Sequence, residues 1–152
     1  MGICVNMIVK NESANLHRLF KSLENVVDFY VIYDTGSTDN TVEKIKELGE
    51  LHNIKGIVFS EPWVNFAYNR NIALKKAFQL YNVGVHSCSW LLIIDADEAL
   101  EHITKESLLS LDKNFSYNGY QLYRDHLSRQ KLLISTLQQE WYWEGETHNY
   151  TN

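Results

Sequence analysis

Three carboxylates follow directly on one apolar run in this sequence. The segment WLLIIDADEAL, residues 90–100, is suited to the centre of a sheet and ends with Asp95, Asp97 and Glu98 close together. Carboxylates at this spacing repel one another unless a positive charge lies between them. Clustered oxygen ligands suit Mg²⁺ or Mn²⁺, which proteins usually share with substrate phosphates. The sequence therefore suggests a divalent-metal site, and the alternative is a solvated strand end whose acids cap the next helix.

Another apolar run also ends at an acidic residue. The run FYVIY, residues 29–33, stops at Asp34; the turn GSTDN follows, and Asn40 with Glu43 predicts a capping box that opens a helix. Ligands of parallel α/β sheets bind outside the carboxyl ends of the strands, so we expect Asp34 and Asp95 to face one crevice. The alternative for Asp34 is that it caps its own turn. The sequence contains no GxxxxGK or GxGxxG loop, so a nucleotide would be held through metal and side chains.

Strand-like and helix-like segments alternate along the chain and would position these acids. Apolar runs at residues 3–9, 29–33, 54–59 and 90–95 are separated by segments in which apolar residues recur at helical spacing. Such continuous runs indicate a mostly parallel sheet covered by helices on both faces, as in doubly wound α/β folds. After residue 115 the pattern changes to alternating strands, which predicts antiparallel additions at the sheet edge.

Length and composition fit a single domain over residues 1–152. The hydrophobic fraction of 45%, with four Trp and nine Tyr, favours a packed core. The net charge of −5, without a basic stripe, argues against nucleic acid as a partner. The two cysteines form no CxxC motif, the first ten residues lack the features of a signal peptide, and no run reaches membrane-spanning length. We therefore expect a cytoplasmic protein without a transmembrane segment.

Four segments, in this order, resemble one enzyme family: MIVKNESANLHRLFKSL, VDFYVIYDTGSTDNTVE, EPWVNFAYNRNIALKKA and WLLIIDADEAL. They are similar to the nucleotide-sugar-binding part of family 2 glycosyltransferases, which have the Rossmann-like GT-A fold. The resemblance runs from residue 3 to about residue 100 and resumes at WYWEGETHNY, residues 141–150. It implies a hexosyltransferase-like enzyme that moves a sugar, with inversion, from a nucleoside diphosphate sugar to a hydroxyl of a glycan, lipid or protein. The implied donor is a UDP-sugar, and the implied cofactor is Mn²⁺ or Mg²⁺.

The same resemblance implies roles for residues on the nucleotide side. Residues just past the first strand would border the base and ribose, namely Val9, Lys10, Asn11 and Glu12. Asp34 would accept a hydrogen bond from the nucleobase, commonly uracil. Arg70, in the NRN segment, would reach the nucleotide from its helix, and the alternative is a snorkelling surface arginine.

The resemblance also implies a set of metal ligands. Asp95 would contact the ribose or the metal, Asp97 would coordinate the metal that bridges the diphosphate, and His148 would add a contact to either. A cation there stabilises the charge on the departing phosphate more in the transition state than in the ground state. For His148 the alternative is an ordinary packed or exposed imidazole.

The base that inverting transfer needs is less clear in the sequence. One carboxylate must accept the proton of the attacking hydroxyl. In the related branch of the family a glutamate follows the histidine, whereas this chain has Asn149, and an amide cannot take that proton. The acids left as candidates for this base are Glu98, Asp125 and Glu146. The resemblance also implies more residues on the acceptor side than remain before Asn152, so a short form and a fragment of a longer protein are both open.

Two other functions are consistent with the sequence. The first is a nucleotide-sugar-binding module or inactive partner of a larger transferase, which Asn149 and the early C-terminus favour. The second is a phosphatase of the haloacid dehalogenase type, in which an apolar strand also ends in DxD and the first Asp is a nucleophile. That pattern requires Thr or Val two residues beyond the second Asp, where this chain has Ala99. The donor sugar, the acceptor and the oligomeric state are left open, because loops shape the pockets that select them.

Overall fold

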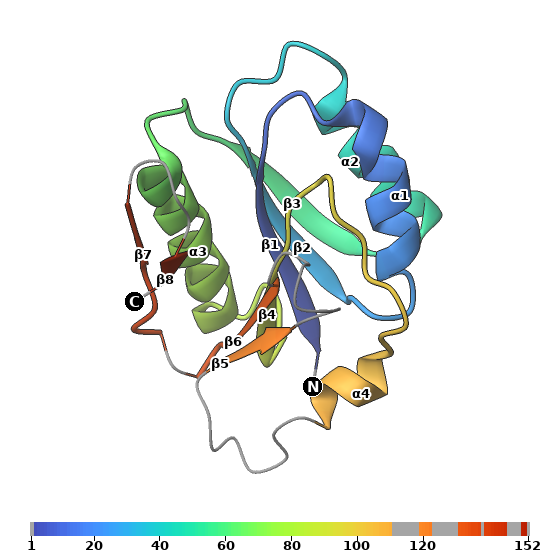
Figure 1. Cartoon of the computed structure of the whole chain (residues 1–152), viewed down its shortest axis with the longest axis vertical. Helices are drawn as coiled ribbons and strands as arrows, with labels where there is room; N and C mark the ends of the chain where they lie inside the picture. Colours follow the sequence, from blue (N-terminus) through green and yellow to red (C-terminus); the bar gives the residue numbers. More distant parts are fainter. Residues whose placement is uncertain (1, 111–118, 123–130, 138, 146–149, 152) are drawn as a thin grey trace.

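The two strands that lead to Asp34 and Asp95 belong to one sheet (Figure 1). The computed structural model of the chain describes residues 2–110, 119–122, 131–137, 139–145 and 150–151. Within these ranges the sheet contains six strands: β1 (Ile3–Val9), β2 (Phe29–Asp34), β3 (Lys55–Ser60), β4 (Trp90–Ile93), β5 (Gly119–Leu122) and β6 (Lys131–Ser135). Their spatial order is β3-β2-β1-β4-β6-β5.

The strand directions match the prediction from the sequence. β1 pairs in parallel with β2 and with β4, and β2 pairs in parallel with β3. β6 runs antiparallel to both β4 and β5. The expected mostly parallel α/β sheet with antiparallel pairing after residue 115 is therefore confirmed. A two-stranded antiparallel ribbon, β7 (Trp143–Glu144) with β8 (Tyr150–Thr151), lies outside this sheet, and β7 contacts helix α3 (Phe66–Asn82).

Helices cover both faces of the sheet. α1 (Ser13–Leu23) and α2 (Thr41–Leu51) lie together on one face, and α3 lies on the other (Figure 1). The short helix α4 (Lys105–Leu109) follows β4 in sequence. The buried side chains of α1 recur at helical spacing, at Leu16, Leu19, Phe20 and Leu23, as the sequence predicts.

Two hydrophobic cores result from this layering, one on each side of the sheet. Alternate residues of β1, such as Val5 and Met7, pack with Leu16 and Phe20 beneath α1 and α2. On the opposite side, Cys4 belongs to the core that includes Leu74, Ala77 and Phe78 of α3. Because both faces of the strands are buried, their sequences are continuous apolar runs instead of alternating ones.

The start of α2 differs from the prediction. The Asn40 side chain makes no capping hydrogen bond, so the capping box expected from Asn40 and Glu43 is not formed. The residue before Asn40 makes the polar contacts instead: Asp39 Oδ1 accepts a hydrogen bond from the Thr41 backbone N–H at 3.0 Å, and its Oδ2 accepts one from the Ser13 hydroxyl at 2.8 Å. Asp39 therefore links the first turns of α1 and α2, which the local sequence pattern alone does not predict.

The strand order creates a switch point next to β1. The chain places β2 and β3 on one side of β1 and then crosses to place β4 on the other side. In open α/β sheets, ligands bind outside the carboxyl ends of the strands at such a point. None of the helices in the described ranges combines the length and hydropathy needed to cross a membrane.

Candidate functional site

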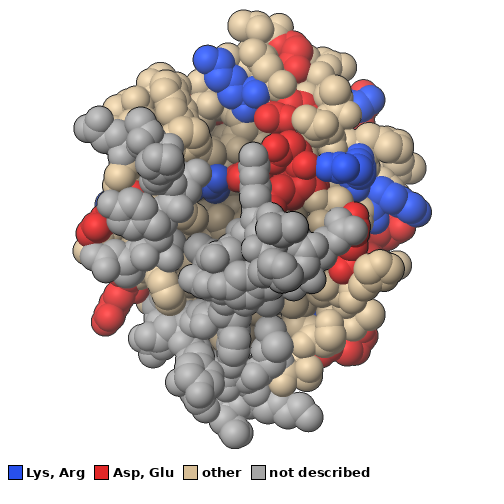
Figure 2. All heavy atoms as spheres, viewed as in Figure 1, with Lys and Arg blue, Asp and Glu red and all other residues tan. Residues whose placement is uncertain are grey.

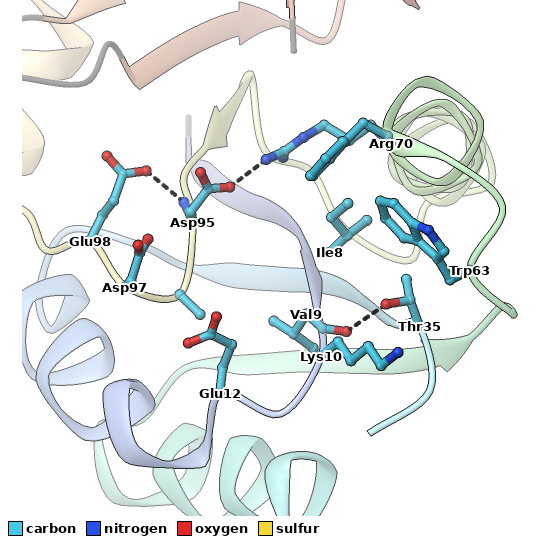
Figure 3. Close-up of a pocket in the computed structure, with 12 residues that line it drawn as sticks. Ile8, Val9, Lys10, Glu12, Thr35, Trp63, Arg70, Asp95, Asp97 and Glu98 are labelled. Carbon is cyan, nitrogen blue, oxygen red and sulfur yellow. Dashed lines mark hydrogen bonds and ion pairs between the residues drawn. The ribbon is translucent and has the colours of Figure 1, made fainter. Parts of the chain in front are cut away.

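A cleft of about 740 Å³ opens at the carboxyl ends of β1 and β4, at the switch point (Figure 3). Its walls come from four segments, which contribute Ile8, Val9, Lys10 and Glu12 at the end of β1 and just past it, Thr35 after β2, Trp63, Phe66 and Arg70 around the start of α3, and residues 95–98 after β4. This volume lies within the usual range for pockets that bind small molecules.

Residues 95–98, here named the acidic loop, bring three carboxylates together. Asp95, Asp97 and Glu98 each offer an oxygen, and these oxygens lie within 4.8 Å of one another. Asp97 is exposed and the other two are half-buried. Glu98 Oε1 accepts a hydrogen bond from the Asp95 backbone N–H at 2.9 Å, and the Glu98 N–H donates to the Asp95 carbonyl at 3.0 Å, which closes the turn. Converging carboxylate oxygens are the donor set that Mg²⁺ and Mn²⁺ prefer.

Helix α1 holds the acidic loop from one side. Arg18 Nη2 donates a hydrogen bond to the Asp97 carbonyl at 2.6 Å. One turn further along the helix, the Ser22 hydroxyl oxygen accepts a hydrogen bond from the Leu100 backbone N–H at 2.9 Å. Sequence reasoning missed both residues, because nothing in the sequence of α1 distinguishes a polar side chain that reaches this loop from one that faces solvent.

Arg70 holds the acidic loop from the other side. It is 5% exposed and forms an ion pair with Asp95, so the snorkelling alternative is wrong. Its guanidinium carbon lies 5.0 Å from the centroid of the Trp143 ring, at a distance typical of a cation–π contact. Its Nε atom is buried and has no hydrogen-bond partner within the described part of the chain. A positive charge therefore lies against the acidic loop at the back of the cleft.

The surface at this end of the molecule has mixed charge. Figure 2 shows acidic side chains gathered around a hollow, with basic side chains close beside them. Lys10 and Arg70 are the basic residues among those that line the cleft, against Glu12 and the three acids of the acidic loop. The lining of the cleft therefore combines four acidic side chains with two basic ones, of which Arg70 is buried.

Asp34 is used within its own turn. It is 6% exposed, and its Oδ2 accepts hydrogen bonds from the backbone N–H groups of Gly36 and Ser37 at 3.2 and 3.1 Å. The turn-capping alternative is therefore observed, while the role of Asp34 toward a nucleobase stays a prediction. The next residue, Thr35, lines the cleft instead, and its hydroxyl donates to the Val9 carbonyl at 3.1 Å.

The residues at the end of β1 and in the loop after it have two different roles. Val9, Lys10 and Glu12 line the cleft. Asn11 has a positive φ of 52°, and its Oδ1 accepts a hydrogen bond from the Thr38 backbone N–H at 2.7 Å. Asn11 therefore ties the β1–α1 loop to the β2–α2 loop, and it is not among the residues that line the cleft.

Three of the residues proposed from the sequence fall outside the described ranges: Asp125, Glu146 and His148. Their roles stay predictions. Conversely, sequence reasoning missed the aromatic wall formed by Trp63 and Phe66. The available signal was an aromatic residue in a short loop between a strand end and a helix, where loops of α/β folds carry binding residues.

The fold and this cleft define an α/β domain with a cleft at the switch point of its sheet, where such folds bind their ligands, beside a carboxylate cluster. A comparison with protein families identifies the class further. The family model described as "Glycosyl transferase family 2" matches residues 4–146, and the chain belongs to this family. The resemblance expected from the sequence is confirmed, and the haloacid dehalogenase alternative loses its support.

Curated relatives of this chain are also named as glycosyltransferases. An uncharacterised glycosyltransferase, RP128, from Rickettsia prowazekii (strain Madrid E) is 28% identical over 118 residues, which cover 78% of this chain and 35% of that protein. The relative from Rickettsia felis (strain ATCC VR-1525 / URRWXCal2) is 27% identical, with 78% and 36% covered. The chain thus spans about a third of the length of the curated relatives it matches.

Solved structures show the same fold. The S. aureus TarS fragment 1-349 in complex with UDP has a TM-score of 0.61 at 17% identity, with 78% of this chain and 34% of that chain covered. The M. tuberculosis glucosyl-3-phosphoglycerate synthase has a TM-score of 0.56 at 16% identity, with 90% and 58% covered. At these identities the likeness establishes the fold, which is the expected GT-A arrangement.

Proposed function

We propose that this chain is the donor-binding part of a metal-dependent, inverting glycosyltransferase whose donor is a UDP-sugar. The observation that carries the proposal is the convergence of Asp95, Asp97 and Glu98, with carboxyl oxygens within 4.8 Å, inside the cleft at the switch point. Family membership supports transfer of a sugar from a nucleotide. The TarS structure in complex with UDP, which has the same fold, supports uridine as the nucleoside.

Charge balance supports a divalent ion at the acidic loop. The three carboxylates lie close enough to repel one another strongly, at about 4 kcal/mol per pair for a 4 Å separation at an effective dielectric constant of 20. The Arg70 guanidinium offsets one of these charges through its ion pair with Asp95. A divalent ion bound by Asp97 and Glu98 would offset the other two and would still accept phosphate oxygens of the donor. When bound, this ion supplies charge stabilisation to the departing diphosphate.

Individual residues of the cleft would then have different roles in binding the donor. Asp97, exposed at the mouth of the cleft, would provide the ligand most accessible to the metal–diphosphate complex. Asp95 would be oriented by Arg70 and by its backbone hydrogen bond to Glu98. Val9, Lys10 and Glu12 would border the nucleoside, since they line the cleft next to β1.

The geometry of the acidic loop reduces the number of candidates for the catalytic base. The carboxylate of Glu98 lies within the cluster and accepts the Asp95 N–H, which favours a ligand or positioning role over proton transfer to an acceptor hydroxyl. We therefore propose Asp125 or Glu146 as the base and His148 as a further contact to the metal or diphosphate. All three stay predictions from the sequence.

Calorimetric titration with UDP tests this function. The native chain should bind UDP in the presence of Mn²⁺ or Mg²⁺ and lose most of that binding in EDTA. Asp97→Asn should weaken metal-dependent binding by about 10-fold or more, because one anionic ligand is lost. The matched control is Glu106→Gln, which removes an exposed acid on α4 with the same change in net charge and should bind as the native chain does. Equal binding in EDTA and in Mn²⁺ would contradict the proposal.

A binding module without catalysis is the second candidate. One observation favours it: Asn149 stands where the resemblance predicts a glutamate. Release of free UDP from UDP-sugars over hours, measured for the native chain, separates the two functions. Metal-dependent binding of UDP without any release of UDP from its sugars would favour the module.

A further inference from the structure

The segment before α3 presents a large aromatic side chain to the cleft and fixes its position. Trp63 is 43% exposed, which is high for a side chain of this size. It lines the cleft together with Phe66. The two rings meet edge to face, with centroids 4.9 Å apart and planes at 86°. This contact restricts the tryptophan ring while leaving much of it open to solvent.

A buried amide fixes the backbone on both sides of this tryptophan. Asn69, which is 1% exposed, donates a hydrogen bond from Nδ2 to the Pro62 carbonyl at 3.1 Å and accepts one at Oδ1 from the Val64 N–H at 2.8 Å. The Asn65 side chain caps α3 immediately afterwards, because its Oδ1 accepts the Tyr68 N–H at 2.8 Å. The flanks of Trp63 are thus held in place before any ligand arrives, which reduces the cost of ordering a binding surface.

The position of Trp63 within the cleft indicates which part of a bound donor it would contact. Figure 3 shows Trp63, Thr35 and Lys10 on one side of the cleft and Asp97 with Glu98 on the other. In a nucleoside diphosphate sugar, the base and the sugar extend in opposite directions from the diphosphate. If the diphosphate lies at the acidic loop, as the proposed function requires, the part of the donor that reaches the β1 and β2 ends is the nucleoside.

On this basis we propose that Trp63 is the stacking platform for the donor nucleobase. The inference rests on the proposed function and adds a specific residue to it. A π-face accepts any planar base, so Trp63 would supply affinity, while polar groups at the strand ends would supply selectivity. Stacking of a base on an aromatic side chain contributes enough that its removal weakens binding by about 10- to 100-fold.

The experiment compares two probes that share the metal–phosphate end but differ in the base. Dissociation constants of UDP and of inorganic pyrophosphate, each with Mn²⁺, are measured by calorimetry for the native chain, Trp63→Leu, Trp63→Phe and Val64→Ala. Trp63→Leu should weaken UDP by about 10- to 100-fold and leave pyrophosphate within about 2-fold. Trp63→Phe keeps a ring and should lose less. Val64→Ala changes an exposed neighbour that does not line the cleft, and should match the native chain.

Tryptophan fluorescence gives a second readout that does not depend on Trp63→Leu folding. UDP should quench the emission of the native chain, pyrophosphate should not, and Trp63→Phe should lose the quenching. Unchanged UDP affinity in Trp63→Leu, or parallel weakening of UDP and pyrophosphate, would overturn the stacking role. Weakening confined to UDP-sugars, with UDP unaffected, would overturn it as well and assign Trp63 to the sugar. A native chain that binds neither probe would refute the proposed function itself, which is a different result from native binding that Trp63 does not affect.

Discussion

Neutralising Asp95 should destabilise the fold, whereas neutralising Asp97 should not. The Arg70 guanidinium is buried, with a side chain 6% exposed, while the Asp95 side chain is 33% exposed. Asp95→Asn therefore leaves a buried cation without its charged partner. At an effective dielectric constant of 20 and a charge separation of about 4 Å, the lost attraction is about 4 kcal/mol. Water reaches Asp95, so screening reduces the expected loss in unfolding free energy to about 2 kcal/mol.

Asp97→Asn is the matched control within the same loop. It makes the same change in charge, but Asp97 is exposed and belongs to a cluster of like charges. Removing its charge relieves repulsion within that cluster, so in EDTA the unfolding free energy should stay within about 0.5 kcal/mol of native or rise slightly. Both variants should weaken metal-dependent UDP binding. Asp95→Asn should thus affect both stability and ligand binding, whereas Asp97→Asn should affect ligand binding alone.

Urea denaturation followed by far-UV circular dichroism measures both effects. Tryptophan fluorescence is less suitable, because Trp143 lies against Arg70 and would report the local change directly. A double-mutant cycle with Arg70→Met isolates the pair: the coupling between Asp95 and Arg70 should be about 2 kcal/mol, and the coupling between Asp97 and Arg70 should be well below that. A coupling under about 0.5 kcal/mol for Asp95 and Arg70 would refute the reasoning.

Three further predictions concern other parts of the chain. Arg18→Met should weaken Mn²⁺ binding by about 10-fold in calorimetry while leaving the urea midpoint nearly unchanged, because the exposed Arg18 fixes a carbonyl of the acidic loop and fills no core. Gly56→Ala should lower the unfolding free energy by about 1–3 kcal/mol, since its Cβ would lie 2.3 Å from the ring of Tyr30. A hydrogen bond from the Thr41 hydroxyl lowers the pKa of the Asp39 carboxyl. The stability that the ionised Asp39 contributes is therefore present above the ordinary pKa of an aspartate and is lost as the pH falls through the lowered pKa. Asp39→Asn should therefore lower the urea midpoint at neutral pH and approach the native value in acid.

The layered fold could be predicted because its signals are local and repeated. Continuous apolar runs at β1, β2 and β4 identified strands buried on both faces, and the spacing of apolar residues in α1 identified the face that packs. The start of α2 could not be predicted in the same way. Asn40 is a residue type that often caps helices, but Asp39 makes the hydrogen bonds at the start of α2, one of them with Ser13 on α1. A window of a few residues contains no information about that distant partner.

The sequence predicted the charged residues of the acidic loop but not which other residues line the cleft. The acids of the acidic loop stand together in sequence, so their convergence follows from one strand end. Asp34 was expected to face the cleft because it ends β2, yet it caps its own turn and Thr35 lines the wall. Which of two adjacent residues faces a ligand depends on the φ and ψ angles of the turn, which residue type alone does not determine. Trp63 was missed because its exposure follows from tertiary structure, where Asn69 holds its loop.

The contacts around the acidic loop suggest why a metal site there would be ready before the metal binds. Arg18 holds it from α1 on one face of the sheet, and Arg70 holds it from α3 on the other. Both contacts place a cation against the loop, so they offset part of the repulsion among carboxylates that would otherwise spread them apart. A loop held in this way loses little conformational freedom when an ion binds, and more of the interaction energy then appears as affinity. Removing either arginine should therefore weaken metal binding, but only removal of the buried Arg70 should also alter the stability of the fold.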